Sequence, residues 1–429
     1  MTYATLNRSM VRSIAGLAAS TLVAVLGAAG MANAADTLLI RNATVHTLTS
    51  EARAGTDVLI REGRIVEIGR GLSAPNGVRV IDAQGRPVTP GIFAGLSRIG
   101  LEEIGLESTT GDHAQRLGQM RPEFDVSLAY NPAAMSVGVH RSNGLTFTVL
   151  TPGAASGGSL VAGLGAPVSF GESGILSQRI LFVDLGGDAN DLSGGSRAAQ
   201  FMLLRQAIVE ARAPNLVMVH DERLLSPSGR QVLLDFLKNP GLIVFDVDRA
   251  ADIRNVIRLV REEKLRAAIR GGSEAWRIAG ELAAAQIPVI LDPLINLPDS
   301  FDDLGATLEN AARLRKAGVT VAISMRGSEV DDAGKARQAA GNAVAHGMPW
   351  ADGLAALTRV PAEIFGIADR FGSIAVGRPA DLVMWSGDPL EVSSAAMLVV
   401  SNGTVQSLES RHTALRDRYA ERVRSGAAR

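Results

Sequence analysis

Between residues 145 and 324 the chain alternates short apolar runs with stretches of amphipathic helical character. The runs cover residues 145–150, 180–185, 242–247, 265–269, 287–291 and 319–324. Such runs separated by helices predict parallel strands, because parallel neighbours need a crossover connection. So many units favour an α/β fold with a closed (β/α)8 TIM-like barrel. The exact strand count between residues 150 and 240 stays open, because no clean strand follows the helix there.

Both ends of the chain carry a different pattern, in which short apolar runs are separated by turn residues. The first set lies within residues 37–89 and the second within residues 380–403, with turns at Glu62-Gly63 and Asn402-Gly403. Short runs punctuated in this way predict antiparallel strands. The predicted parts are therefore a composite β-sandwich domain of residues 35–90 and 370–408, a barrel of residues 91–369 and a C-terminal helical tail of residues 409–429.

The N-terminal residues read as a secretory signal. Arg8 and Arg12 precede an apolar run over residues 13–30, and small residues at 32–34 offer a cleavage site. We therefore expect a periplasmic or secreted protein whose signal peptide, residues 1–34, is cleaved after Ala34. No later segment is apolar over the roughly 18 residues that a membrane span needs, so no span is expected in the mature chain. With no cysteine in the chain, stability must come from a packed core.

The charge of the chain excludes one class of partner. It has 43 basic and 44 acidic residues, and 46% of its residues are hydrophobic. This composition is typical of a globular protein with a large core. Because nucleic-acid binding proteins usually carry a basic excess, we expect no nucleic-acid partner.

Three framework motifs stand at the edges of the predicted barrel. Residues 61–69 read Arg-Glu-Gly-Arg-Ile-Val-Glu-Ile-Gly, residues 88–91 read Val-Thr-Pro-Gly, and residues 372–383 read Gly-Ser-Ile-Ala-Val-Gly-Arg-Pro-Ala-Asp-Leu-Val. Together they resemble the amidohydrolase superfamily, especially its imidazolonepropionase-like branch. The resemblance spans nearly the whole mature chain and implies a hydrolase scaffold for non-peptide carbon–nitrogen bonds, such as amides and cyclic amides. It also implies one or two divalent metals at the carboxyl-terminal mouth of the barrel, and it leaves a homo-oligomer open.

The metal-ligand positions of active relatives carry other residues here. Relatives have a His-x-His pair in the first strand, histidines ending the fifth and sixth strands, and an aspartate after the eighth. The corresponding places hold, in that order, Leu96 and Arg98, Asp246 and Asp248, Arg270 or Gly271, and Arg326. Because leucine, glycine and arginine do not ligate divalent cations, we predict no metal cofactor, although the family uses one. A shifted alignment would bring Asp331 or Asp332 to the eighth-strand place.

The histidines offer no substitute ligand set. The chain has six, namely His46, His113, His140, His220, His346 and His412, and no two stand at ligand spacing. We interpret His46 and His412 as surface residues, whereas His113 and His140 follow early strands and could approach the barrel mouth. A lone histidine is usually structural, so none is assigned a catalytic role.

The residues that stand at the metal-ligand positions suggest two possible roles for this region. Arg98, Arg270 and Arg326 would converge with Asp246 and Asp248 at the barrel mouth. The interpretation we favour is mutual ion pairing that fills the vacated metal cavity, since buried charges need partners. The other is that surplus arginine binds a small anionic ligand, a carboxylate or a phosphate. Asp246 and Asp248 are also candidates for a general acid and base.

Two further features remain open. The glycine-rich stretch 153–165 matches no phosphate-binding fingerprint and is predicted as a flexible loop. Ser97 and Ser324 lie near strand ends but have no assignable base for a nucleophilic role. The sequence thus favours a non-catalytic descendant of a hydrolase that binds an anionic ligand or a protein partner. The alternative is an active hydrolase of carbon–nitrogen bonds that uses a metal-free or non-standard site.

Overall fold

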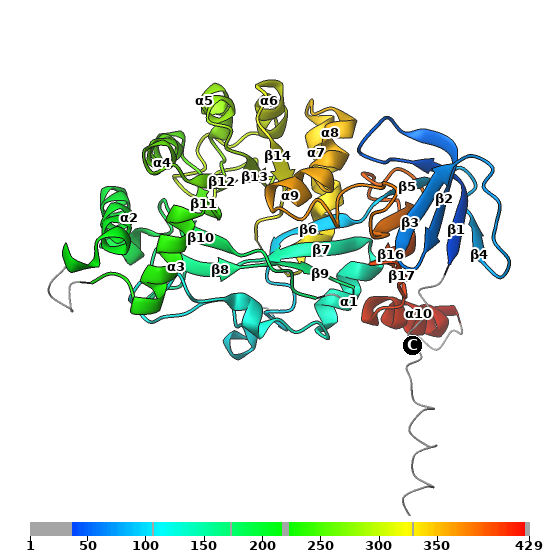
Figure 1. The fold of residues 1–429 in the computed structure, drawn as a ribbon, viewed down its shortest axis with the longest axis horizontal. Helices are drawn as coiled ribbons and strands as arrows, with labels where there is room; N and C mark the ends of the chain where they lie inside the picture. Colours follow the sequence, from blue (N-terminus) through cyan, green and yellow to red (C-terminus); the bar gives the residue numbers. More distant parts are fainter. Residues whose placement is uncertain (1–36, 105–106, 172–173, 217–222, 328–329, 425–429) are drawn as a thin grey trace, which may run out of the picture.

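The computed structural model describes residues 37–104, 107–171, 174–216, 223–327 and 330–424 (Figure 1). The predicted signal peptide, with its cleavage after Ala34, and His220 lie outside these residues. Export therefore stays a prediction. Within the described residues, no helix combines the length and the apolar character that crossing a bilayer requires.

Strands from both ends of the chain form one eight-stranded mixed sheet, drawn in blue and orange at one end of the molecule in Figure 1. Its order is β17-β16-β15-β5-β1-β2-β3, with β4 paired to β1. The strands are β1 (Leu38–Val45), β2 (Arg53–Arg61), β3 (Arg64–Gly69), β4 (Arg79–Asp82), β5 (Pro87–Pro90), β15 (Leu382–Trp385), β16 (Ala396–Ser401) and β17 (Thr404–Val405). The ends of the chain meet where β5 pairs antiparallel with β15, and the sheet encloses its own apolar core.

The middle of the chain supplies two further sheets. The strands are β6 (Ile92–Ser97), β7 (Leu145–Leu150), β8 (Val161–Gly165), β9 (Pro167–Ser169), β10 (Ile180–Asp184), β11 (Leu242–Val247), β12 (Arg266–Gly271), β13 (Val289–Leu291) and β14 (Val321–Ile323). One sheet has the order β14-β13-β12-β11-β10-β8 and the other has the order β6-β7-β9. All neighbours from β10 to β14 are parallel, as are β6 and β7. The predicted mixed α/β class is thereby confirmed.

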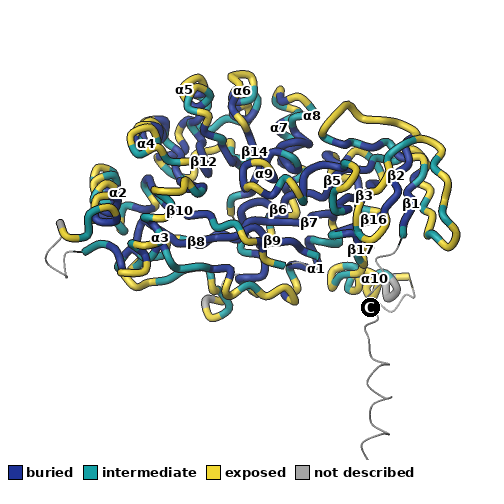
Figure 2. The backbone as a smooth tube through the Cα atoms, viewed as in Figure 1, coloured by how far each residue is buried: buried dark blue, intermediate teal, exposed yellow. Residues whose placement is uncertain are grey.

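Helices cover the outer face of these strands. The described helices are α1 (Met135–Ser142), α2 (Arg197–Arg212), α3 (Pro227–Lys238), α4 (Ala250–Glu263), α5 (Ala279–Ala284), α6 (Asn310–Lys316), α7 (Ala336–Ala345), α8 (Trp350–Ala355), α9 (Arg359–Ile364) and α10 (Arg411–Arg424). Of these, α10 does not cover the strands but lies beside α1 (Figure 1). In Figure 2 the strands are buried and the outward sides of α2, α4, α5 and α6 are exposed. One apolar core lies between strands and helices, and a second one lies inside the strands.

One segment departs from the expected loop. The second half of the glycine-rich stretch 153–165 forms β8, which pairs antiparallel with β10, and the following β9 pairs antiparallel with β7. This segment therefore lies between the two parallel groups. On the opposite side, the backbone N–H of Leu96 donates to Ser324 Oγ at 2.9 Å. Because the described strands form two separate sheets, the structure does not establish the closed (β/α)8 ring.

Candidate functional site

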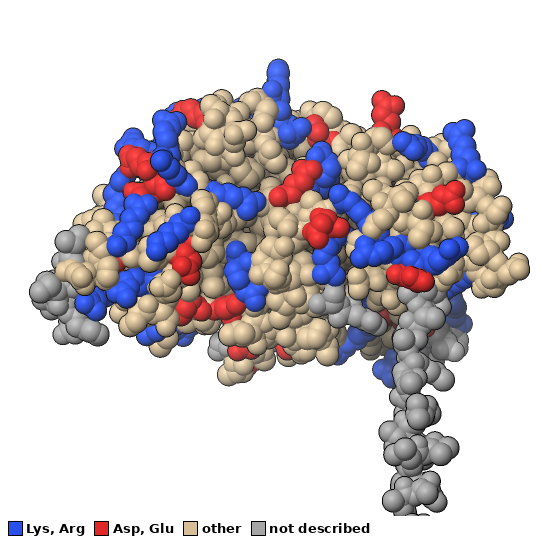
Figure 3. Space-filling model, in the orientation of Figure 1, with Lys and Arg blue, Asp and Glu red and all other residues tan. Residues whose placement is uncertain are grey.

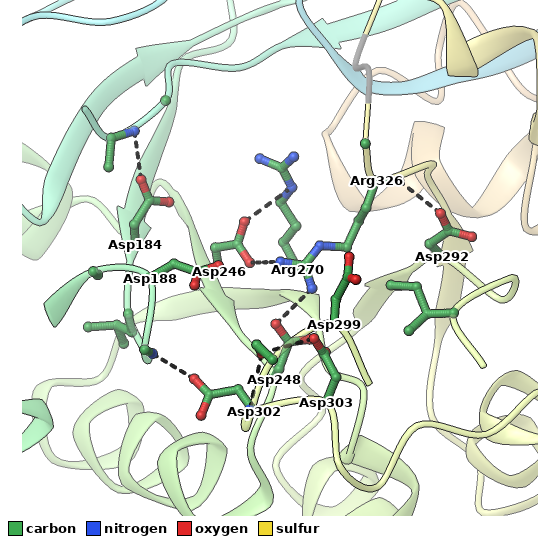
Figure 4. A pocket seen from close by; sticks show the side chains of 18 of the residues that line it. Asp184, Asp188, Asp246, Asp248, Arg270, Asp292, Asp299, Asp302, Asp303 and Arg326 are labelled. Atoms are coloured by element: carbon green, nitrogen blue, oxygen red, sulfur yellow. Dashed lines mark hydrogen bonds and ion pairs between the residues drawn. The ribbon is translucent and has the colours of Figure 1, made fainter. Parts of the chain in front are cut away.

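A cavity of about 880 Å³ opens at the carboxyl ends of the parallel strands (Figure 4). Asp184 ends β10, Asp246 lies near the end of β11, and Arg270 lies near the end of β12. Arg98 directly follows β6, and Asp292 directly follows β13. Ligands of open parallel sheets and of TIM-like barrels bind at this edge, so the cavity is the candidate functional site.

Three charged side chains stand side by side on neighbouring strands. In the ladder Asp184 is opposite Asp246, and Asp246 is opposite Arg270. Residues opposite each other in a sheet point to the same face. That face is the interior one, because Phe182 and Val244, two residues earlier on β10 and β11, belong to the inner apolar core. The strand register therefore directs two carboxylates and a guanidinium into the cavity.

Arginines bind the carboxylates of Asp246 and Asp248 in an ion-pair cluster (Figure 4). The nitrogen Nε of Arg270 lies 3.4 Å from Asp246 Oδ2, and Nη2 of Arg326 lies 3.4 Å from Asp246 Oδ1. Arg326 also places Nη1 2.7 Å from Asp248 Oδ2. The carboxylates of Asp246 and then Asp248 raise the pKa of Arg326 above its ordinary value. The mutual pairing expected for Arg270 and Arg326 is thus present.

Gly271, one of the two residues that could hold the place expected for a histidine, makes room for this cluster. Its φ is +87°, and a Cβ on it would lie 2.7 Å from Asp248 Oδ1 and 3.0 Å from Arg326 Nη1. Any larger side chain would therefore displace the ion pair. The space that a histidine would use at this strand end is taken by a carboxylate and a guanidinium.

The cavity wall contains more carboxylates than the sequence suggested. It holds eight aspartates, namely Asp184, Asp188, Asp246, Asp248, Asp292, Asp299, Asp302 and Asp303. Against them stand three arginines, Arg98, Arg270 and Arg326, so the formal charge of the described wall is −5. The described wall therefore lacks the surplus of arginine that an anionic ligand would require. By contrast, the outer face drawn in Figure 3 shows both signs of charge interspersed.

Several of these aspartates also fix the wall. Asp292 accepts the backbone N–H of Arg326 at 2.9 Å, and burial raises the pKa of this carboxyl. Asp184 accepts the backbone N–H of Ala154 at 2.9 Å. Asp302 pairs with Arg197, which lies outside the lining set. The carboxylates thus come from three segments, namely the end of β10 with the connection after it, the end of β11, and the β13–α6 connection, and this spreads them around the cavity (Figure 4).

The donor set does not fit the divalent metal that the resemblance implies. In the part of the chain that the structure describes, no three histidine, cysteine, aspartate or glutamate residues are grouped closely enough to hold a metal ion. The described lining residues include no histidine. His140 Nε2 contacts the carbonyl O of Val330 at 2.6 Å, and burial lowers the pKa of this ring. His113 Nδ1 lies 3.6 Å from Glu102, and His46 packs on Trp350 with ring centroids 5.0 Å apart.

The remaining candidates from the sequence, two serines and two aspartates, make structural contacts or lie outside the cavity wall. Ser97 Oγ lies 2.7 Å from Thr148 Oγ1, while Ser324 Oγ accepts the backbone N–H of Leu96. Both hydroxyls are buried and tie strands together, as structural side chains do. Asp332 pairs with Lys335 at 2.6 Å, and neither it nor Asp331 is a lining residue.

Comparison with known proteins identifies the family. Residues 215–409 match the sequence profile of the Amidohydrolase family. A crystal structure of an amidohydrolase from Thermotoga maritima MSB8 superposes with a TM-score of 0.75 at 27% identity, covering 86% of this chain and 99% of that chain. The chain belongs to the amidohydrolase superfamily. The resemblance of its framework motifs is confirmed, and its cavity lies at the strand edge expected for this superfamily.

Matches of this superfamily member to curated proteins are short. A dihydroorotase from Citrifermentans bemidjiense is 41% identical over 70 residues, which is 16% of this chain and 16% of that protein. The protein "Amidohydrolase tasK" from Hapsidospora irregularis is 41% identical over 61 residues, 14% of this chain and 6% of that protein. The matched segments are therefore only a small share of each curated relative.

Proposed function

We propose that this amidohydrolase-superfamily chain is a ligand-binding protein without metal-dependent hydrolysis, and that its cavity takes a small organic cation. One observation carries the proposal: Arg326 and Asp248 occupy the space above Gly271, at a strand end where an active relative would present histidine. Guanidinium groups are permanent cations and do not bind metal ions. Among the residues that the structure describes, no donor set supports water activation by a bound metal.

The charge of the wall supports a cationic ligand. Asp246 and Asp248 are neutralised by arginine, but the described wall keeps a formal charge of −5. A concave site lined by one sign of charge concentrates ligands of the opposite sign. Because the carboxylates are spread around the cavity, a ligand with several separated amino groups matches them better than one compact ion. This proposal replaces the anionic ligand expected from the sequence.

A second candidate is hydrolysis of carbon–nitrogen bonds by a non-standard site. The family match favours it, and Asp246 with Asp248 would be its acid and base. A general base must, however, reach a substrate proton. Both carboxylates are already engaged by Arg326, at 3.4 Å and 2.7 Å. The binding function therefore explains the geometry with fewer rearrangements.

Calorimetric titration with spermidine, a linear trication, tests the proposal. We expect spermidine to bind at low ionic strength and inorganic phosphate not to bind. Asp299→Asn removes an exposed wall carboxylate and should weaken spermidine binding about twofold to fivefold, the range for one solvent-screened charge contact. Asp369→Asn, an exposed carboxylate outside the lining residues, is the control and should leave the affinity unchanged. Phosphate binding without spermidine binding would contradict the proposal.

A further inference from the structure

The connection between β13 and α6 carries an unusual exposure of apolar side chains. Leu297 is 77% exposed, Phe301 is 85% exposed and Leu304 is 64% exposed. We call these three residues the apolar edge. Leu297 also lines the cavity, and the neighbours of Phe301, Ser300 and Asp302, do so as well. The apolar edge therefore borders the candidate site.

In this segment the acidic side chains are buried and the apolar ones are exposed, which is the reverse of an ordinary surface turn. Asp302 and Asp303 are only 7% and 8% exposed, whereas the adjacent Phe301 and Leu304 face solvent. Burial of a carboxylate costs free energy unless it is paired, and exposure of a large apolar side chain forgoes the gain from its burial. A segment that could rotate freely would expose the two carboxylates and bury the two apolar side chains. Other contacts must therefore hold it in the observed orientation.

Those contacts are visible on the buried side. Asp302 pairs with Arg197 and accepts the backbone N–H of Gly187 at 2.6 Å. Asp303 Oδ1 accepts from Ser273 Oγ at 2.6 Å. Trp276 Nε1 donates to the carbonyl O of Gly305 at 2.8 Å. Because these polar groups are anchored, the side chains of Phe301 and Leu304 stay exposed to solvent. Exposed apolar side chains of this kind mark interaction surfaces.

We propose that the apolar edge docks a basic segment of a partner protein, whose lysine or arginine side chain enters the cavity. This inference rests on the proposed cation binding, and it names the source of the cation as a basic side chain of a partner protein. Charge complementarity selects the partner, because the described cavity wall beside the edge has a formal charge of −5. Apolar side chains flanking the basic residue then cover Leu297, Phe301 and Leu304.

Fluorescence anisotropy with two labelled peptides tests the docking. One peptide places lysine between leucine and phenylalanine, and the other replaces those apolar residues by glycine. Phe301→Ser should weaken binding of the apolar peptide about tenfold or more, as expected when a large apolar contact is lost, and should not change the spermidine affinity. Val392→Ser is the control, because Val392 is 70% exposed on the β15–β16 connection. It should change neither affinity.

The outcomes separate the two proposals. Spermidine binding with equal affinity for both peptides would overturn the docking inference and leave cation binding intact. Loss of all cation binding would overturn both proposals. Self-association of the full chain that Phe301→Ser abolishes, measured by sedimentation, would assign the edge to a second copy and overturn the docking of a foreign segment. A tenfold preference for the apolar peptide that Phe301→Ser removes supports the inference.

Discussion

Replacing Arg326 by methionine is expected to lower the free energy of unfolding by about 2 to 3 kcal/mol, less than for a fully buried ion pair because the Arg326 side chain is 26% exposed. Methionine keeps much of the side-chain volume but removes the cation that Asp246 and Asp248 share. Asp248 would then keep the backbone N–H of Ser273 at 3.0 Å and would share the single Ser273 hydroxyl proton with Asp303. Urea unfolding followed by circular dichroism measures the effect.

A matched control separates the effect of losing the Arg326 ion pairs from the effect of removing any arginine side chain. Arg254 pairs with Glu281 at 2.9 Å, but each side chain is 49% exposed. Arg254→Met should therefore cost no more than about 1 kcal/mol. Adding Asp246→Asn and Asp248→Asn to Arg326→Met should restore part of the lost stability, since the uncompensated charges are then removed. Unchanged stability of the single Arg326 variant would show that this arginine is held for another purpose.

Replacing Gly165 by alanine is expected to cost at least about 4 kcal/mol, at the upper end for single substitutions. A Cβ there would lie 1.9 Å from the backbone O of Leu150 and 2.7 Å from Phe182 Cε2. The backbone of β7 cannot rotate away as a flexible side chain could. The clash would therefore separate β8 from the strands on either side. Urea unfolding, or pulse proteolysis of cell extracts if little folded protein accumulates, measures the loss.

Gly138→Ala is the control for this substitution. Gly138 lies within α1, and a Cβ on it would meet no atom within 4 Å. Alanine is favoured over glycine in a helix, so this variant should be more stable by about 0.5 to 1 kcal/mol. Equal stability of the Gly165 and Gly138 variants would mean that residues 161–169 do not pack between β7 and β10.

The site residues at the strand ends could be predicted from the sequence, because strands that run parallel place their carboxyl ends at the same edge. Apolar runs located β7 and β10 to β14, and the carboxyl ends of parallel strands share one edge. Arg98, Asp246, Arg270 and Arg326 were therefore expected together, and all line the cavity. Asp184 was missed, although it stands at the end of its apolar run.

Other parts could not be predicted, because distant contacts determine them. Asp302 and Asp303 reach the cavity on a long connection whose path depends on Arg197 and Ser273. The stretch 153–165 reads as a loop because it is rich in glycine. Its second half becomes a strand only because β10 offers an edge to β8.

Elemental analysis combined with a turnover assay tests the absence of a metal site most directly. Protein purified without chelator should contain divalent metal well below one ion per chain, and added zinc or manganese should not induce amide hydrolysis. The ion pairs of Arg326 would then stand where a metal site would be. A near-stoichiometric divalent ion, together with amide cleavage that a chelator abolishes and zinc or manganese restores, would contradict the account.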